Sequence, residues 1–378
     1  MGIYLNKGND AFKKELSRRI YVDKSMLISK TNEAVEHGNP FWCVTRLRRS
    51  GKTMALEMLQ AYYSKGCDSR ELFHGLKIEN DPSFEKHLNK HNVILIDIAS
   101  IMTNYSRKSD CFQSFRQKLI KELKDAFPLP NDDAITLPDV LRNIFVELKE
   151  TFIFLIDEWD SVFREMYDDK KMREDYMDLL RSLFKNTLLS PAIDLVYMTG
   201  ILPIPKGVSQ SSLNNFTEYN MLNPDGLEEY FGFTQEEVDS LCEKFDMDKE
   251  EMRHWYNGYH YGNLSIYNPW SVVNAITDEQ FGDYWNATCS IEALTTYMNY
   301  GDGLLKKDMM SLMEGKEVKF NPRLFDNDLT KVDSTDAALT VLVHFGYLSY
   351  DSENCTCRIP NYEIKQAFIT AFKILNWD

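Results

Sequence analysis

The chain has 378 residues and a formal net charge of −15 at pH 7, from 58 acidic and 43 basic side chains. This length predicts two domains, or one large domain with an appendage, and the acid excess argues against a generic nucleic-acid binder, because phosphate contacts need a basic face. The sequence contains no run of about 18 apolar residues, so we predict no transmembrane helix.

The first predicted element with chemical content is an apolar run at residues 41–45, which has the pattern of a buried strand. It leads into the basic loop TRLRRSGKT, which ends in Gly51, Lys52 and Thr53, and an apolar helical stripe comes next. This order of strand, loop and helix is typical of a phosphate-binding P-loop. Arg46 stands where that pattern begins with glycine, so the loop alone leaves open a basic helix N-terminus with a chance match.

Each residue type at the end of the loop suits phosphate chemistry. Gly51 lets the backbone turn so that its N–H groups point at phosphate oxygens. Lys52 would neutralise the β- and γ-phosphates of ATP, and the Thr53 hydroxyl would hold Mg²⁺. The predicted nucleotide-binding set is Arg48, Arg49, Ser50, Gly51, Lys52, Thr53 and Met54.

Strand and helix patterns alternate through the first part of the chain. We predict further strands at residues 92–100, 151–160, 193–200 and 217–222, and helices at residues 111–127, 138–149 and 172–187. This alternation predicts an α/β fold with a parallel sheet and helices on both faces. In such folds the ligand lies at the carboxyl ends of the strands.

Two acids come directly after the apolar part of the strand predicted at 151–160. In P-loop ATPases the first acid holds Mg²⁺ and the second polarises the attacking water, so we assign Asp157 to the metal and Glu158 to catalysis. Thr199 ends the next strand and is predicted to sense the γ-phosphate, the alternative being an ordinary strand-end threonine. Three arginines could supply a charge-stabilising finger or only surface salt bridges, and the sequence does not select among Arg164, Arg173 and Arg181.

The alternation stops after about residue 230. We predict short helices at residues 235–245, 249–256 and 269–276, and a hairpin over residues 341–360 with its polar turn at 351–354. A helix followed by a hairpin is compatible with a winged helix, but this hairpin is not basic, which favours packing over DNA contact. Residues 363–365 spell ExK without a suitable Asp strand before them, so we do not predict nuclease catalysis. The seven scattered cysteines, among them Cys289, form no CxxC pair and indicate reduced thiols in the cytoplasm.

Several sequence motifs, which follow one another in the same order along the chain, resemble those of the bacterial AAA-ATPase-like family: YVDK, TRLRRSGKT, FLIDEWD, YMTGILPI, WYNGYHYG and YNPWSV. That family lacks the first P-loop glycine, so Arg46 fits it, whereas Leu47 and Ser50 depart from its usual Pro and Phe. The resemblance implies an additional-strand P-loop NTPase core with the sensor strand between the P-loop and Walker B strands, then a mainly helical lid and a winged-helix-like end. It also implies that residues 21–24 lie near adenine and that Asn268 and Pro269 touch the nucleotide.

We therefore expect residues 1–230 to form a P-loop ATPase core and residues 231–378 to form a helical lid and winged-helix-like domain. The expected function is Mg²⁺-dependent binding and hydrolysis of ATP that drives or gates an attached or partner effector. The alternative is a nucleotide-operated switch with little turnover, and a DNA-binding role is disfavoured. Longer family members carry a C-terminal PD-(D/E)XK nuclease-like domain, which we expect to be absent from this chain, and the oligomeric state stays open.

Overall fold

The computed structural model describes residues 2–103, 110–130, 133–206, 213–262, 264–285, 291–300 and 304–377. The chain divides into two compact units, the first being Met1–Val44 with Lys52–Glu218 and the second Thr45–Gly51 with Tyr219–Asp378. The basic loop therefore packs with the C-terminal part of the chain, while the functional boundary at residue 230 stays a prediction. No helix among the described residues has the length and apolar character needed to cross a bilayer. The described cysteines are free thiols, and Cys289 lies outside the described residues.

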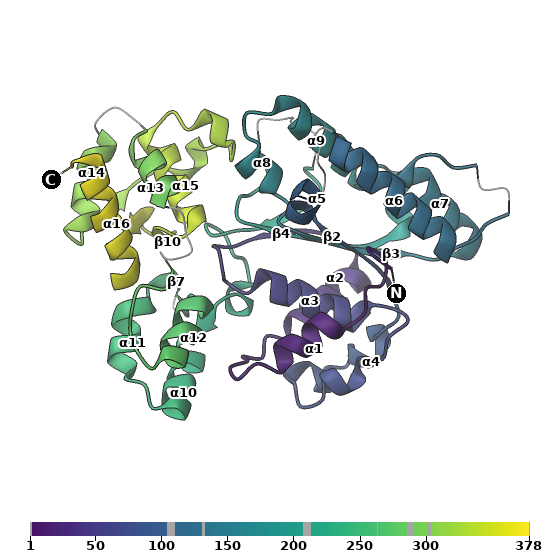
Figure 1. Cartoon of the computed structure of the whole chain (residues 1–378), viewed down its shortest axis with the longest axis horizontal. Helices are drawn as coiled ribbons and strands as arrows, with labels where there is room; N and C mark the ends of the chain where they lie inside the picture. The colour runs from purple at the N-terminus through teal and green to yellow at the C-terminus, as the bar shows by residue number, and fades with distance from the viewer. Residues whose placement is uncertain are drawn as a thin grey trace. The chain divides into compact units, whose positions relative to one another are not determined.

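A five-stranded sheet lies at the centre of the first unit (Figure 1). Its strands are β1 (Phe41–Thr45), β2 (Asn92–Asp97), β3 (Phe152–Asp157), β4 (Ile193–Gly200) and β5 (Thr217–Tyr219), in the order β2-β3-β4-β1-β5. Strands β2, β3 and β4 pair in parallel, with Asp97 beside Asp157. The α/β fold class is confirmed, and β4 lies between the P-loop strand β1 and the acid-bearing strand β3.

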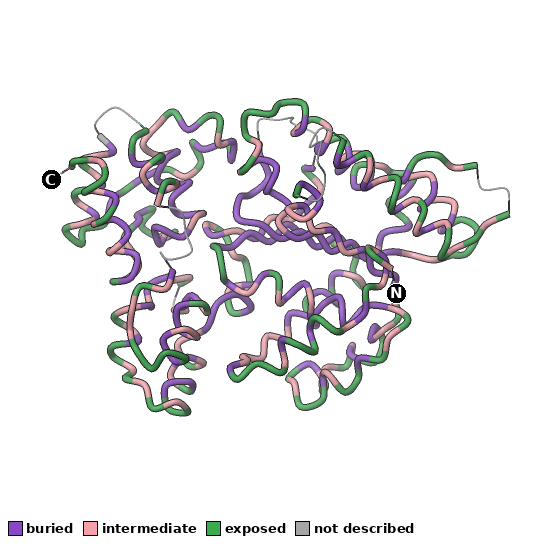
Figure 2. The backbone as a smooth tube through the Cα atoms, viewed as in Figure 1, coloured by how far each residue is buried: buried purple, intermediate pink, exposed green. Residues whose placement is uncertain are grey.

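Helices cover both faces of this sheet (Figure 1). One face carries α1 (Asp10–Leu16), α2 (Leu27–His37), α3 (Lys52–Tyr63) and α4 (Phe84–His87); the other carries α5 (Ile98–Thr103), α6 (Cys111–Ala126), α7 (Leu137–Leu148), α8 (Ser161–Glu165) and α9 (Lys170–Phe184). Every residue of β3 is buried between these layers, as the continuous burial of the strands in Figure 2 shows. A strand covered on both sides needs a continuous apolar run, which the sequence FIFLI supplies.

Three predicted strands end three residues earlier than expected: β3 ends at Asp157, not at residue 160, and polar side chains cap the helix or turn that follows the other two. Strand β2 ends at Asp97, not at residue 100, because the Asp97 carboxylate accepts hydrogen bonds from the Ser100 N–H (2.9 Å) and hydroxyl (2.6 Å) and so begins α5. Strand β5 ends at Tyr219, and the Asn220 side chain then accepts from the Leu222 N–H at 2.9 Å in a turn. Asx turns of this kind compete with strand pairing.

The second unit begins with helices that carry strong capping signals. Its first elements are β6 (Phe233–Thr234), α10 (Gln235–Phe245), α11 (Lys249–Tyr256), β7 (Tyr259–Tyr261), β8 (Leu264–Tyr267) and α12 (Pro269–Asp278). Thr234 and Glu237 form a reciprocal capping box at α10, and Asp248 caps α11. The predicted bounds of α10 and α11 are confirmed, and the caps explain why each helix starts where the sequence indicates. Asn268 caps α12, which runs two residues beyond its predicted end.

The C-terminal part of the second unit joins helices to a small antiparallel sheet. Its elements are α13 (Ile291–Met298), α14 (Leu304–Met313), β9 (Val318–Lys319), two short 3₁₀ turns (Pro322–Leu324 and Leu329–Lys331), α15 (Thr335–Phe345), β10 (Ser349–Asp351), β11 (Thr356–Arg358) and α16 (Tyr362–Leu375). The sheet order is β10-β11-β9, with both pairings antiparallel. The winged-helix assignment of this end stays a prediction.

The hairpin predicted over residues 341–360 is wrong in its first half. The apolar run at 341–345 belongs to α15, and only β10 and β11 form the hairpin. An apolar run does not distinguish a strand from a buried helix, and here the caps decide. Ser334 accepts from the Ala337 N–H at 3.2 Å, and Gly346 ends the helix with φ 86°. A Cβ at Gly346 would also lie 2.8 Å from Leu47 Cβ, which explains the glycine.

Candidate functional site

The Asp157 carboxylate at the end of β3 brings three predicted site residues together. It accepts hydrogen bonds from the Thr53 hydroxyl (2.8 Å, to Oδ2) and from the Thr199 hydroxyl (2.6 Å, to Oδ1). The Glu158 N–H also donates to Oδ1 at 3.0 Å, and Asp157 is only 8% exposed. Thr53 lies on the first turn of α3 and Thr199 at the end of β4, so three separate elements meet at one carboxylate.

Lys52 begins α3 and is buried, which is unusual for a lysine. Burial lowers the pKa of its ammonium group, and the nearby carboxylates Glu158 and Asp157 oppose that shift. A buried ammonium group of this kind favours an additional anionic partner, because a second negative group would stabilise its charged form. The two acids and Lys52 thus form a charged cluster within the first unit.

Glu158 projects from an uncommon backbone conformation. Its φ is +51°, in the left-handed region, where a residue with a Cβ costs on the order of 1 kcal/mol. One oxygen of its carboxylate, Oε2, forms an ion pair with the Arg164 guanidinium, and its side chain is 33% exposed. Burial raises the pKa of Glu158, and the charge of Arg164 opposes that rise.

A second acid of the same segment, Asp160, is completely buried and ties β4 to the cluster. Its Oδ2 accepts from the Ile201 N–H at 3.1 Å, the Leu202 N–H at 2.9 Å and Arg164 Nε at 2.8 Å. A Cβ at Gly200 would lie 2.4 Å from Asp160 Oδ1, so only glycine fits there. Asp160 was not predicted from the sequence. The signal was the acid four residues before Arg164, which is ion-pair spacing on a helix.

The predicted finger arginines differ in their surroundings. The side chain of Arg164 is 8% exposed and bonds to acids of the cluster. Arg181 pairs with Asp178 at 2.9 Å on the surface of α9, which is the ordinary alternative that the sequence left open. Arg173 lies on the same helix α9.

Arg46 has a structural role in the second unit. It is 2% exposed, and its guanidinium donates to the carbonyl oxygens of Tyr219 (2.8 Å) and Thr45 (2.9 Å). It also lies 5.1 Å from the centre of the Phe231 ring. The arginine in place of the first P-loop glycine therefore anchors the base of the loop to the end of β5 and to the segment after it.

The rest of the loop is held by its backbone. The Ser50 carbonyl accepts from the Gly232 N–H at 2.9 Å, and the Arg48 carbonyl accepts from Asn268 Nδ2 at 3.1 Å. Arg48 and Arg49 are exposed, and Arg49 and Gly51 have φ values of +63° and +95°.

The guanidinium of Arg49 lies 3.9 Å from the centre of the Trp270 ring on α12. Asn268, which donates to the Arg48 carbonyl, and Trp270 therefore both contact the loop.

For residues 21–24, the structure shows local bonds, such as Asp23 accepting from the Ser25 N–H at 2.8 Å and the Lys77 N–H at 2.7 Å. Their placement near adenine stays a prediction, as does that of Met54 in the nucleotide-binding set.

Glu363, the first residue of the ExK motif, bonds to uncharged hydrogen-bond donors. Glu363 is 1% exposed, and its carboxylate accepts from Ser271 Oγ (2.7 Å) and from the N–H groups of Tyr284 and Trp285 (both 2.8 Å). Among the described residues, no group of three or more His, Cys, Asp or Glu side chains is arranged to hold a metal ion. The bonds of Glu363 give it a structural role at the start of α16.

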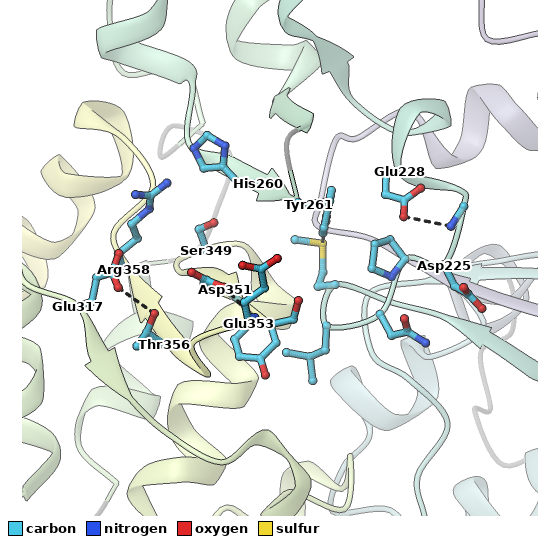
Figure 3. A pocket seen from close by; sticks show the side chains of 18 residues that line it. Asp225, Glu228, His260, Tyr261, Glu317, Ser349, Asp351, Glu353, Thr356 and Arg358 are labelled. Atoms are coloured by element: carbon cyan, nitrogen blue, oxygen red, sulfur yellow. Dashed lines mark hydrogen bonds between the residues drawn. The ribbon is translucent and has the colours of Figure 1, made fainter.

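A cavity of about 630 Å³ in the second unit has the wrong charge for phosphates (Figure 3). Its lining includes five carboxylates, from Asp225, Glu228, Glu317, Asp351 and Glu353, against the side chains of Arg358 and His260. Burial lowers the pKa of His260, and Arg358 adds to that shift, so the histidine adds little positive charge. The acids at the β10–β11 turn would repel a nucleic-acid backbone.

A family model and one curated relative match large parts of the chain. The family model described as Predicted AAA-ATPase matches residues 8–208. The "Uncharacterized protein in vnfD 5′region" of Azotobacter chroococcum mcd 1 is 22% identical over 274 residues, which are 71% of this chain and 50% of that protein. The chain thus spans about half the length of this curated relative.

The similarity to solved structures is lower. The ORC2 protein of Aeropyrum pernix is 11% identical with a TM-score of 0.35, covering 97% of this chain and 99% of that one. CDC6P from Pyrobaculum aerophilum is 10% identical with a TM-score of 0.32, covering 95% and 97%. Scores this low carry no argument about this chain. The family model alone spans more than half of the 378 residues, and the chain belongs to the AAA-ATPase-like family.

Proposed function

We propose that the protein binds ATP together with Mg²⁺ and hydrolyses it. The observation that carries the proposal is the Asp157 carboxylate, which bonds to hydroxyls from the first turn of α3 and the end of β4. Membership in a family described as Predicted AAA-ATPase supports a P-loop ATPase in general.

Each residue of the cluster has a defined task in this proposal. Lys52 neutralises the β- and γ-phosphates, and the backbone N–H groups of the loop at residues 48–51 bind phosphate oxygens. Thr199 contacts the γ-phosphate and senses its presence. Glu158 accepts a proton from the attacking water and orients it for in-line attack. The loop's left-handed Gly51 and the helix start at Lys52 suit an anion, because both aim N–H groups at it.

The donor set at the end of β3 fits Mg²⁺. Thr53 Oγ1 and the Asp157 carboxylate are hard oxygen ligands, and Mg²⁺ commonly takes only one or two protein oxygens beside water and phosphate. When bound, this ion neutralises the charge that develops on the transferred phosphoryl group. Thr53 and Asp157 already bond to each other at 2.8 Å, so the two ligands are held together.

A nucleotide-operated switch with little turnover is the second candidate, and the packing of the loop favours it. The Arg48 and Ser50 carbonyls accept hydrogen bonds from Asn268 and Gly232, and all four residues belong to the second unit. A nucleotide that orders this loop would therefore bias contacts of the second unit. In this proposal, that bias drives or gates an effector.

Nucleotide titration and phosphate release on one preparation separate the two candidates. The wild-type chain is compared with Lys52→Ala and with Lys149→Ala, which removes an exposed lysine at the end of α7. Binding with phosphate release, lost only in Lys52→Ala, supports the ATPase. Binding without release supports the switch. If neither binding nor release occurs, or if both variants behave alike, the assignment of Lys52 is wrong.

A further inference from the structure

We propose that Arg164 is a positioning residue for Glu158, holding one carboxylate oxygen so that the other is presented to the attacking water. The proposal deepens the ATPase function above and rests on it. Arg164 Nη2 pairs with Glu158 Oε2, and within the described residues Glu158 Oε1 accepts no hydrogen bond. The Glu158 side chain is 33% exposed, so water can reach it.

The guanidinium is itself held in place. Its Nε donates to Asp160 Oδ2 at 2.8 Å, and Nη2 also lies 3.2 Å from Ser161 Oγ. The Arg164 side chain is 8% exposed and the Asp160 side chain is fully buried, so neither can swing freely. A planar guanidinium can bond to two carboxylates from different edges at once, which a lysine ammonium on a flexible stem does poorly.

The bonding of Arg164 argues against a finger that touches phosphate. Its guanidinium already serves Glu158, Asp160 and Ser161. Burial alone would lower its pKa, but the two acids together raise it, so the group stays charged. Its effect on the reaction therefore passes through Glu158, which is the meaning of a positioning residue.

The same chain of bonds reaches the end of β4. Asp160 Oδ2 accepts from the N–H groups of Ile201 and Leu202, which lie two and three residues after Thr199. A displacement of the strand end that carries Thr199 would thus be transmitted through Asp160 and Arg164 to Glu158. This connection gives a physical route by which γ-phosphate contact at Thr199 would affect the position of the base.

Steady-state kinetics and ATP titration on three variants test the proposal. In Arg164→Met we expect kcat to fall about 10- to 100-fold while ATP affinity stays within about twofold, because the base is misplaced but the phosphate ligands remain. Arg181→Met makes the same substitution at a surface arginine and should match the wild type in both kcat and affinity.

Arg164→Lys keeps the test decisive if Arg164→Met fails to fold because Asp160 loses its cationic partner. The lysine keeps the positive charge, yet kcat should fall at unchanged ATP affinity because one ammonium group cannot hold both acids. Wild-type kcat in a folded Arg164 variant would overturn the positioning role alone. A wild-type chain that binds ATP without turnover would instead overturn the proposed ATPase function.

Discussion

The end of β3 in the first unit and the start of α16 in the second unit each hold a glutamate that is at least partly buried, and they use it differently. Burial raises the pKa of both Glu158 and Glu363. Glu158 is partly exposed and pairs with the charged Arg164, whereas Glu363 is 1% exposed and bonds to neutral donors from α12 and from residues 284–285. Burial and a raised pKa therefore do not identify a catalytic acid on their own.

The partners of the two carboxylates explain the difference. Both oxygens of Glu363 are engaged, so the group ties α16 to α12 and has no oxygen left for a substrate. Glu158 has one engaged oxygen, a strained backbone with φ +51° and a neighbouring lysine whose pKa burial lowers. Strained residues beside unusual titrating groups are a common feature of reactive sites.

The largest expected effect is on ATP turnover, which should fall in a Glu158 variant but not in a Glu363 variant. Glu158→Gln should lower ATP turnover by about 10²- to 10⁴-fold, because glutamine cannot accept the proton, while ATP binding is retained. Glu363→Gln is the matched control and should leave turnover within about twofold of the wild type. Phosphate release and nucleotide titration on the three proteins measure both quantities. A similar loss of turnover in both variants would remove the distinction drawn between the two sites.

The pH dependence of the unfolding free energy tests the role of Glu363, the second glutamate of the comparison. The pKa of Glu363 is raised by burial from 4.5 to about 7, so its stabilising contribution is complete below about pH 4.5 and is lost as the pH rises through about 7. In Glu363→Gln the amide oxygen can accept from both N–H groups and the NH₂ can donate to Ser271, so this loss should vanish. The difference in unfolding free energy between variant and wild type should change by about 3 kcal/mol from pH 4.5 to 8.

Urea unfolding at several pH values measures that difference. The matched variant is Glu158→Gln, whose carboxylate lies in the other unit and is partly exposed. Parallel stability profiles for the wild type and Glu363→Gln would mean that the folded state already holds Glu363 ionised. That outcome would make the two glutamates electrostatically alike.

Elements with strong local signals could be predicted from the sequence. The bounds of β1 and β4 match, because Thr45 and the Thr199–Gly200 pair end their mainly apolar runs. The run at 341–345 has the pattern of a strand because α15 is buried throughout residues 337–344 and shows no polar face to solvent there. Periodicity carries no information when a helix is apolar all round.

The part of the candidate site that lies at the carboxyl ends of the parallel strands could be predicted from the order of the motifs along the chain. Thr53, Asp157 and Thr199 do meet, because the carboxyl ends of neighbouring parallel strands share one edge of a sheet. Their roles with nucleotide stay predictions. The burial of Arg46 against Tyr219 and the bond from Asn268 to the Arg48 carbonyl could not be foreseen, since partners more than 170 residues away leave no local pattern.

A smaller effect is expected at the start of α12, where neutral bonds hold the loop. Asn268 accepts from the Trp270 N–H at 2.9 Å as the helix cap and donates to the Arg48 carbonyl at 3.1 Å. Asn268→Ala removes both bonds and should lower the unfolding free energy by about 1–2 kcal/mol. Asn268→Asp keeps the cap but cannot donate, so it should recover part of that loss.

The Asn268 pair also bears on turnover. If the start of α12 acts on structure and binding only, both variants should weaken ATP affinity and leave kcat at saturating ATP within about twofold. Calorimetric titration and phosphate release on each variant give the two numbers. A kcat as low as that of Glu158→Gln would show that the neutral site takes part in the chemical step.

The smallest expected effect is at Trp270, which is 36% exposed beneath the Arg49 guanidinium. An exposed cation–π pair contributes about 0.5–1 kcal/mol, so Trp270→Leu should destabilise the fold by about that amount in urea. Trp270→Phe keeps a ring and loses only the bond from Nε1 to the Tyr284 carbonyl at 3.2 Å, so it should fall between Leu and the wild type. Equal stability of the Leu and Phe variants would mean that the ring face contributes nothing to the position of Arg49. The loop would then be held by the hydrogen bonds of Arg46 and those to the Arg48 and Ser50 carbonyls, and the contrast between a charged first site and a neutral second site would become sharper.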